Sequence, residues 1–203
     1  MSYFGFFKNY LEENMKQILW SKTILTAYRY LERIVSAIDK LVIKEAMGSI
    51  SSDSLIYSLK SAEAVTSKIL DYTEKKVALI NTKLLIEKAL YSMKKEQALI
   101  LVKKYINGKK TNDIIAEIGC PRRSYYRKLE SATKTFAYVV KMMGFSEEKL
   151  DDMLSDQKWL MKIYAKFELE QIEENASNFE FESDASSIFL QNLHKLNKVS
   201  LFN

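Results

Sequence analysis

The chain has 203 residues, 47% of them hydrophobic and 28% charged, values typical of a folded water-soluble domain that exclude wholesale disorder. Five glycines and one proline are too few turn residues for a many-stranded sandwich, a barrel or a nucleotide-binding α/β fold. The sequence therefore predicts an all-α fold. No stretch reaches the roughly 18 uninterrupted apolar residues of a membrane span, so no membrane partner is expected.

The single His and the single Cys restrict the chemistry that the chain can perform. They cannot supply a common zinc ligand set, a disulfide or a catalytic relay of Cys and His unless the two meet in space. The sequence contains no phosphate-binding loop, and the spacing of its acidic residues is that of a solvated surface. We therefore expect no cofactor, no metal site and no enzymatic activity. The unpaired Cys and the lack of a secretory signal pattern predict a cytoplasmic protein.

Charge is sorted along the chain. Residues 81–143 carry 14 Lys and Arg against 5 Asp and Glu, whereas residues 144–203 carry 6 against 12. The middle of the chain therefore has a net charge of +9 and the tail a net charge of −6. A basic block of this size favours contact with a polyanion, and the tail is expected either to contact another partner or to shield the basic block.

Residues 1–93 are predicted to form a long helical hairpin. Apolar residues spaced by three and four mark two helical stripes, and a polar loop at 48–54 separates them. Lys76 and Lys83 fall on the second stripe where apolar residues are expected. Near-heptad seams of this kind predict either an antiparallel hairpin or a self-associating coiled coil. Because one hairpin leaves part of this apolar surface uncovered, we also expect a homodimer. The stripes consist of Ile24, Tyr28, Leu31, Val35, Ile38 and Val42 in the first helix, and Ala62, Val65, Ile69, Tyr72, Leu79, Ile86, Leu90 and Met93 in the second.

Residues 94–144 are predicted to contain three shorter helices. The first spans 97–106 and ends at Asn107-Gly108, the second spans 111–118 and ends at Gly119-Cys120-Pro121, and the third spans 122 to about 143 and ends at Gly144. The second and third have the spacing of a helix-turn-helix. The third would bury Tyr125, Leu129, Ala132, Phe136 and Val139.

Residues 145–203 are predicted to form an acidic helical extension. Ser146 can cap an amphipathic helix that runs to Phe167, and its regular apolar stripe favours packing into the core. The acidic stretch 168–184 is expected to be a linker or a short extended piece with a regulatory or polymerase-contacting role. A last helix is expected at 186–198.

Arginine is concentrated at the start of the third short helix. Three of the five arginines, Arg122, Arg123 and Arg127, lie within six residues in a chain with 26 lysines. Arg binds guanine edges and phosphates in a bidentate manner, so its placement favours DNA binding over a merely solvated basic face. The helical spacing places Arg123, Arg127, Glu130 and Lys134 opposite the buried stripe. Ahead of the second helix, the residues suited to binding backbone phosphates are Lys109, Lys110, Thr111 and Asn112.

The stretch from Ile80 to Ala137 resembles the phage-type late transcription regulators of the RinA/ArpU kind, whose C-terminal half is similar to the region 4 helix-turn-helix of sigma-70 factors. Three runs carry the resemblance: KKYINGKK at 103–110, DIIAEIG at 113–119 and RRSYYRKL at 122–129. Two residues depart from the usual pattern. Pro121 replaces a capping Ser, and Ile115 stands where Ala is preferred, so the two helices are expected to splay.

The resemblance implies a sequence-specific DNA-binding transcription regulator, an activator of phage or mobile-element genes that acts on double-stranded DNA with RNA polymerase. On this reading Arg122 and Lys128 anchor phosphates, while Arg123, Ser124 and Arg127 reach base edges. Tyr126 either contacts DNA at the rim or packs on the preceding helix. The alternative function is a helical interaction protein, or a sigma-like factor, that binds polymerase or another regulator without reading DNA.

Overall fold

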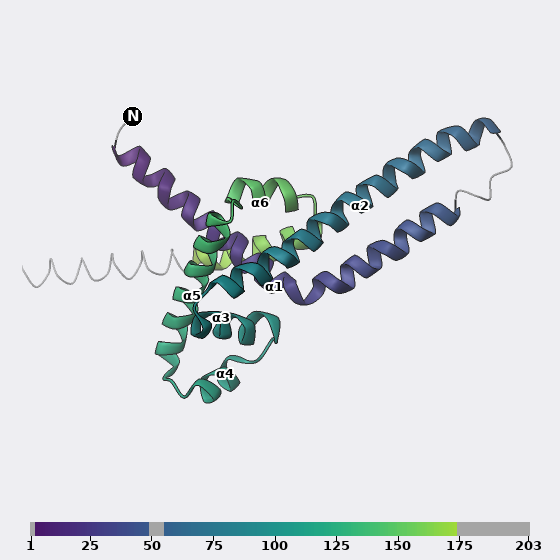
Figure 1. Cartoon of the computed structure of the whole chain (residues 1–203). Coiled ribbons are helices and arrows are strands. Elements are labelled where there is room, and N and C mark those ends of the chain that lie inside the picture. Colours follow the sequence, from purple (N-terminus) through teal and green to yellow (C-terminus); the bar gives the residue numbers. More distant parts are fainter. Residues whose placement is uncertain (1–2, 49–54, 174–203) are drawn as a thin grey trace, which may run out of the picture. The chain divides into compact units, whose positions relative to one another are not determined.

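The computed structural model describes the backbone of residues 3–48 and 55–173 and the side chains of residues 14–47 and 62–173. The loop expected at 48–54 and the helix expected at 186–198 therefore lie mostly or wholly outside the described residues. Contacts divide the chain into one unit of residues 1–164 and a second of residues 165–203. The described part contains helices and no strand, so the prediction of an all-α fold is confirmed (Figure 1).

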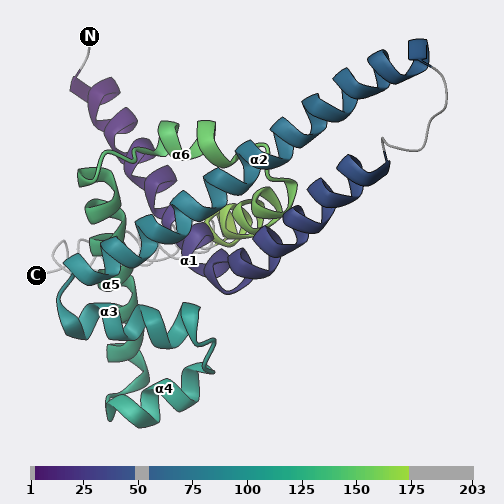
Figure 2. The ribbon, with the colours of Figure 1, turned by 45° about the vertical axis from the view of Figure 1, so that its right-hand side comes forward.

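Two long helices open the first unit. Helix α1 spans Tyr3–Gly48 and α2 spans Leu55–Ser92, so the first helix ends at the predicted glycine but begins well before the predicted stripe. The Thr23 and Thr26 hydroxyls donate to the carbonyls of Leu19 and Lys22, each at 2.8 Å. Such bonds favour bending of a helix, and α1 changes direction part-way along (Figures 1 and 2).

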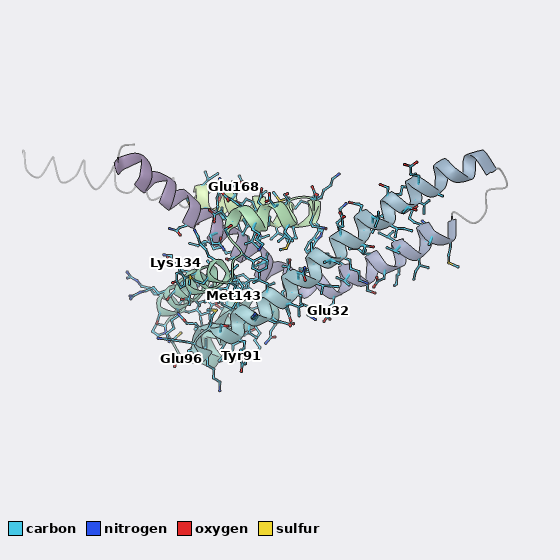
Figure 3. The ribbon with its side chains drawn as sticks, turned by 45° about the horizontal axis from the view of Figure 1, so that its top comes forward. Glu32, Tyr91, Glu96, Lys134, Met143 and Glu168 are labelled. Atoms are coloured by element: carbon cyan, nitrogen blue, oxygen red, sulfur yellow. The ribbon has the colours of Figure 1, made fainter. Side chains whose placement is uncertain are left out.

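The second half of α1 pairs with α2 as an antiparallel hairpin. Lys76 donates to Asp39 at 2.5 Å, and Lys83 donates to Glu32 at 2.5 Å. In both pairs the residue numbers sum to 115, as expected for two helices that run in opposite directions. The two lysines that interrupt the apolar seam are therefore matched by carboxylates from α1 (Figure 3, Glu32 labelled).

Besides α2, helix α1 packs against the π-helix η2 (Val102–Ile106), α5 (Arg122–Met142) and α6 (Glu147–Leu154). The unit also contains α3 (Lys95–Leu101) and α4 (Thr111–Ile118). The Gln17 side-chain amide donates to the Phe145 carbonyl at 3.1 Å, and Trp20 lies 4.8 Å from the Tyr164 ring. One core cluster thus joins residues from 20 to 160. Its fully buried members include Ile24, Leu31, Leu79, Ile86, Phe136, Val140, Leu150, Leu154 and Leu160.

Two expectations from the sequence are wrong in detail. The helix predicted at 97–106 is α-helical only to Leu101 and then widens into the π-helix η2. The helix predicted from Ser146 to Phe167 is interrupted at 155–157, and a second helical stretch runs over 158–173. The chain turns there so that Leu154, Gln157 and Leu160 are all buried.

Residues 145–164 of the tail belong to the first unit and contribute Leu150, Leu154 and Leu160 to its core. Ser146 caps α6 as predicted, and its hydroxyl accepts from the Lys149 backbone at 3.5 Å. Residues 168–173 are helical, which corrects the linker or extended piece expected at this point.

Candidate nucleic-acid interface

The candidate interface is built on α4, a tight turn and α5, together called the HTH unit (residues 111–142). Gly119 ends α4 with φ +66°, and its N–H donates to the Ile115 carbonyl at 2.9 Å. This left-handed conformation favours Gly, because a Cβ there brings backbone strain. Pro121 then precedes α5 without a side-chain cap. Both helices begin and end within one residue of their predicted bounds.

A small apolar cluster joins the two helices of the HTH unit to α3. Ile114 of α4, Tyr125 of α5 and Ile100 of α3 form its buried part. Ile115, which the sequence marks as unusually large, is half-buried against this cluster together with Leu129. Burial also raises the pKa of the Tyr125 hydroxyl, which lies beside Thr111. The cluster fixes which face of α5 is turned inward.

The opposite face of α5 is exposed and basic. Arg123, Arg127 and Lys128 are exposed and make no ion pair with any side chain in the described part of the chain. Lys134 is also exposed, but its ammonium group donates a hydrogen bond to Glu130, one turn before it, at 2.6 Å (Figure 3, Lys134 labelled). The predicted outward placement of Arg123, Arg127, Glu130 and Lys134 is confirmed. Two of the four are thus left available to a ligand.

Arg122, Tyr126 and Ser124 occupy the flanks of the same helix. The Arg122 guanidinium lies 5.9 Å from the centre of the Tyr126 ring, which in turn meets the Tyr125 ring edge-on at 5.4 Å. Tyr126 remains about half exposed, at 46%. It therefore rests on its own helix while presenting one side to solvent. Ser124 is half-buried.

The residues ahead of α4 are more engaged than their sequence indicates. Glu117 accepts hydrogen bonds from both Lys103 and Lys109, and these two lysines lower the pKa of its carboxyl to about 2. The half-buried Thr111 accepts from Lys104 at 3.3 Å. Lys110 and Asn112 are exposed. Of the four predicted phosphate contacts, Lys109 and Thr111 therefore already have partners within the chain.

Sequence reasoning missed a residue that the fold brings to this surface. Arg29 of α1 is exposed, and its side chain lies directly over Gly108, where an added Cβ would come within 1.9 Å of the guanidinium. Gly108 has φ +63° and closes η2. Arg29 and the turn are 79 residues apart, so no local pattern could have linked them. The one available signal was that Arg29 belongs to the small set of arginines.

In the described part of the chain, no three His, Cys, Asp or Glu side chains are grouped so that they could hold a metal ion. None of its helices has an apolar stretch that could cross a bilayer. Cys120 is half-buried in the turn of the HTH unit and is a free thiol. Comparison with protein-family models, with curated proteins and with solved structures found no match.

Proposed function

We propose that the protein is a sequence-specific DNA-binding transcription regulator in which the HTH unit contacts duplex DNA. The observation that carries this proposal is the exposed basic face of α5, where Arg123, Arg127 and Lys128 follow a tight turn and form no ion pair with any residue that the structure describes. Elsewhere the described chain pairs many of its cations with carboxylates, as in the hairpin. Arginines that have no carboxylate partner among the described residues are suited to bind phosphates and base edges.

In this proposal, one set of residues contacts the bases and another contacts the phosphates. Arg123 and Arg127 lie one turn apart on the outer face of α5, so both can enter a major groove and reach base edges. Lys110 and Lys128 supply charge to the flanking phosphates. Arg122 is held over the Tyr126 ring, which positions its guanidinium at the edge of the same surface. Arg29 adds a cation from α1 beside the turn that precedes α4.

The role in transcription rests on the sequence resemblance. Regulators of the RinA/ArpU kind activate late genes, and the sigma region 4-like character of residues 94–144 favours RNA polymerase as the partner. We therefore propose activation of phage or mobile-element genes. A protein that binds polymerase without reading DNA is the competing function, and the experiment below separates the two.

Selection of binding sites from a pool of random duplexes tests the proposal. The full chain should enrich a defined motif, and its affinity for that motif should exceed its affinity for a scrambled duplex by at least about a thousandfold at physiological salt. Lys110→Ala should weaken both duplexes alike and reduce the salt slope by about one ion. A control that removes a cation far from the HTH unit, Lys44→Ala, should change neither. Failure to enrich any motif, together with binding to purified polymerase, would favour the competing function.

A further inference from the structure

Helix α2 carries a second stripe of exposed apolar residues outside the seam that it buries against α1, and two of them, Ile80 and Leu84, border the hollow between the two helices. Leu70, Val77, Leu84 and Tyr91 repeat every seven residues and are 57%, 50%, 57% and 92% exposed. Ile80 lies on the same side and is also exposed. These five residues, called the outer seam, are distinct from the seam that α2 buries against α1, which contains Leu79 and Ile86.

A seven-residue apolar repeat on an exposed helix face is the pattern by which helices pack side by side. Single exposed apolar residues are normal on a protein surface, but a row of four at constant spacing forms a continuous contact strip. The strip runs from Leu70 to Tyr91, a rise of roughly 31 Å along the helix axis. It is therefore long enough for a helix–helix interface.

The charges beside the outer seam indicate which helix fits. Glu74 and Lys88 flank the seam on the same side, and both side chains are exposed without an ion pair in the described part of the chain. When two copies of α2 pack in opposite directions about a point near residues 80 and 81, Glu74 of one copy lies opposite Lys88 of the other. The same arrangement places Val77 opposite Leu84, and Leu70 opposite Tyr91. One two-fold axis thus matches both the apolar row and the charged row.

We propose that the outer seam is a homodimer interface, in which α2 packs antiparallel against α2 of a second copy of this chain. The inference is independent of DNA binding, because the outer seam and the HTH unit share no residue. It also gives a location to the self-association that the sequence predicts. Each dimer then carries two HTH units, so a DNA target would contain two half-sites.

Sedimentation of the full chain at micromolar concentrations tests the interface. The wild type should have the mass of a dimer, and Leu84→Glu should raise the dimer dissociation constant at least about tenfold, because the seam centre then buries a carboxylate. Leu99→Glu, which adds the same charge at an exposed apolar site on α3, is the matched control and should leave the mass unchanged. Circular dichroism checks that each variant stays helical. A wild type that sediments as a monomer overturns the proposal.

Charge reversal tests the pairing of Glu74 with Lys88. Glu74→Lys and Lys88→Glu should each weaken the dimer by placing like charges opposite one another, and the double variant should recover wild-type affinity. Loss of affinity that is additive in the double variant would contradict the arrangement.

Cysteine cross-linking tests the direction of the two helices, in a Cys120→Ser background. Asn81→Cys lies beside the two-fold axis and should form a disulfide with its own copy. Leu70→Cys should not, because antiparallel packing separates the two copies of this residue by roughly 31 Å. Cross-linking at both positions would show parallel packing and overturn the proposed arrangement.

Discussion

The basic residues of the hairpin and those of the HTH unit differ in what faces them. In the hairpin, Lys76 and Lys83 lie on the seam between α1 and α2, and each has a carboxylate of α1 at 2.5 Å. On α5, Arg123 and Arg127 are exposed and have no such partner within residues 14–47 and 62–173. Positively charged residues thus have different roles in the two regions. The paired lysines set the register of two helices, whereas the unpaired arginines remain available for an external anion.

Helix α5 has both a buried face and an exposed basic face. Substitution on its buried face should cause the largest loss of stability. Phe136 is fully buried in the core that joins α1, α2 and α6. Phe136→Ala should lower the free energy of unfolding by about 3–5 kcal/mol, because it leaves a cavity in a packed core. Urea denaturation followed by circular dichroism measures the change. An effect below 1 kcal/mol would mean that α5 does not hold the unit together.

The exposed face of the same helix should behave in the opposite way. Arg123→Ala and Arg127→Ala should each weaken binding to the selected DNA motif by about 1–3 kcal/mol, through lost contacts with base edges. The urea midpoint should stay within error of the wild type, because neither side chain packs on the fold. Fluorescence anisotropy with selected and scrambled duplexes provides the measurement. Equal loss on both duplexes would assign these arginines to phosphates instead of bases.

The Arg29 side chain lies over Gly108 in the turn between η2 and α4, and one added methyl group can disrupt this packing. Gly108→Ala should destabilise the unit by about 1–2 kcal/mol, because φ is +63° and the new Cβ collides with the Arg29 guanidinium. The double variant Gly108→Ala, Arg29→Ala should recover only the part due to the collision. No recovery in urea denaturation would show that the backbone conformation alone causes the loss.

The HTH unit also contains paired lysine charges, as the hairpin does, because the Glu117 carboxylate forms ion pairs with Lys103 and Lys109. Glu117→Gln should release both lysines, raise affinity for scrambled DNA and steepen its salt dependence by about one to two ions. The pKa of Glu117 is lowered to about 2, so the carboxylate is charged and the cluster intact at any pH above its unfolded value. The variant's effect on affinity should therefore be constant between about pH 5 and 8. An unchanged salt slope would show that Lys103 and Lys109 do not reach DNA.

Loss of an ion pair in the hairpin should cause the smallest change in stability. Lys76→Met removes the ion pair with Asp39 but keeps the aliphatic stem on the seam, so the free energy of unfolding should change by less than about 1 kcal/mol. DNA affinity should stay at the wild-type value. A large loss of stability would mean that the seam depends on its charges more than on its apolar residues.

Local signals in the sequence predict where most helices begin and end. Gly48, Gly119 and Gly144 each mark a helix end, and Ser146 caps α6, because turn and cap preferences act within a few residues. The same reasoning places Tyr125 inside and Arg127 outside, because helical periodicity alone decides the face of α5.

Contacts between distant segments account for what the sequence did not predict. The widening of η2 at 102–106 and the break at 155–157 have no local signal such as Gly or Pro within the interrupted stretch. The sequence predicts Lys109 as an available cation because its partner, Glu117, becomes its neighbour only when α4 folds back on η2. The position of Arg29 likewise has no local signal in the sequence. Its place beside Gly108 depends on how α1 packs against η2.

DNA reading by α5 can be tested by the ratio of affinities for selected and scrambled duplexes, measured in parallel for Arg123→Ala/Arg127→Ala and for Lys76→Met. We expect the ratio to fall by about two to four orders of magnitude in the arginine double variant, since each base contact contributes about 1–3 kcal/mol of discrimination. The ratio should be unchanged in Lys76→Met. Equal ratios in the two variants would contradict the claim that the unpaired face of α5 reads DNA.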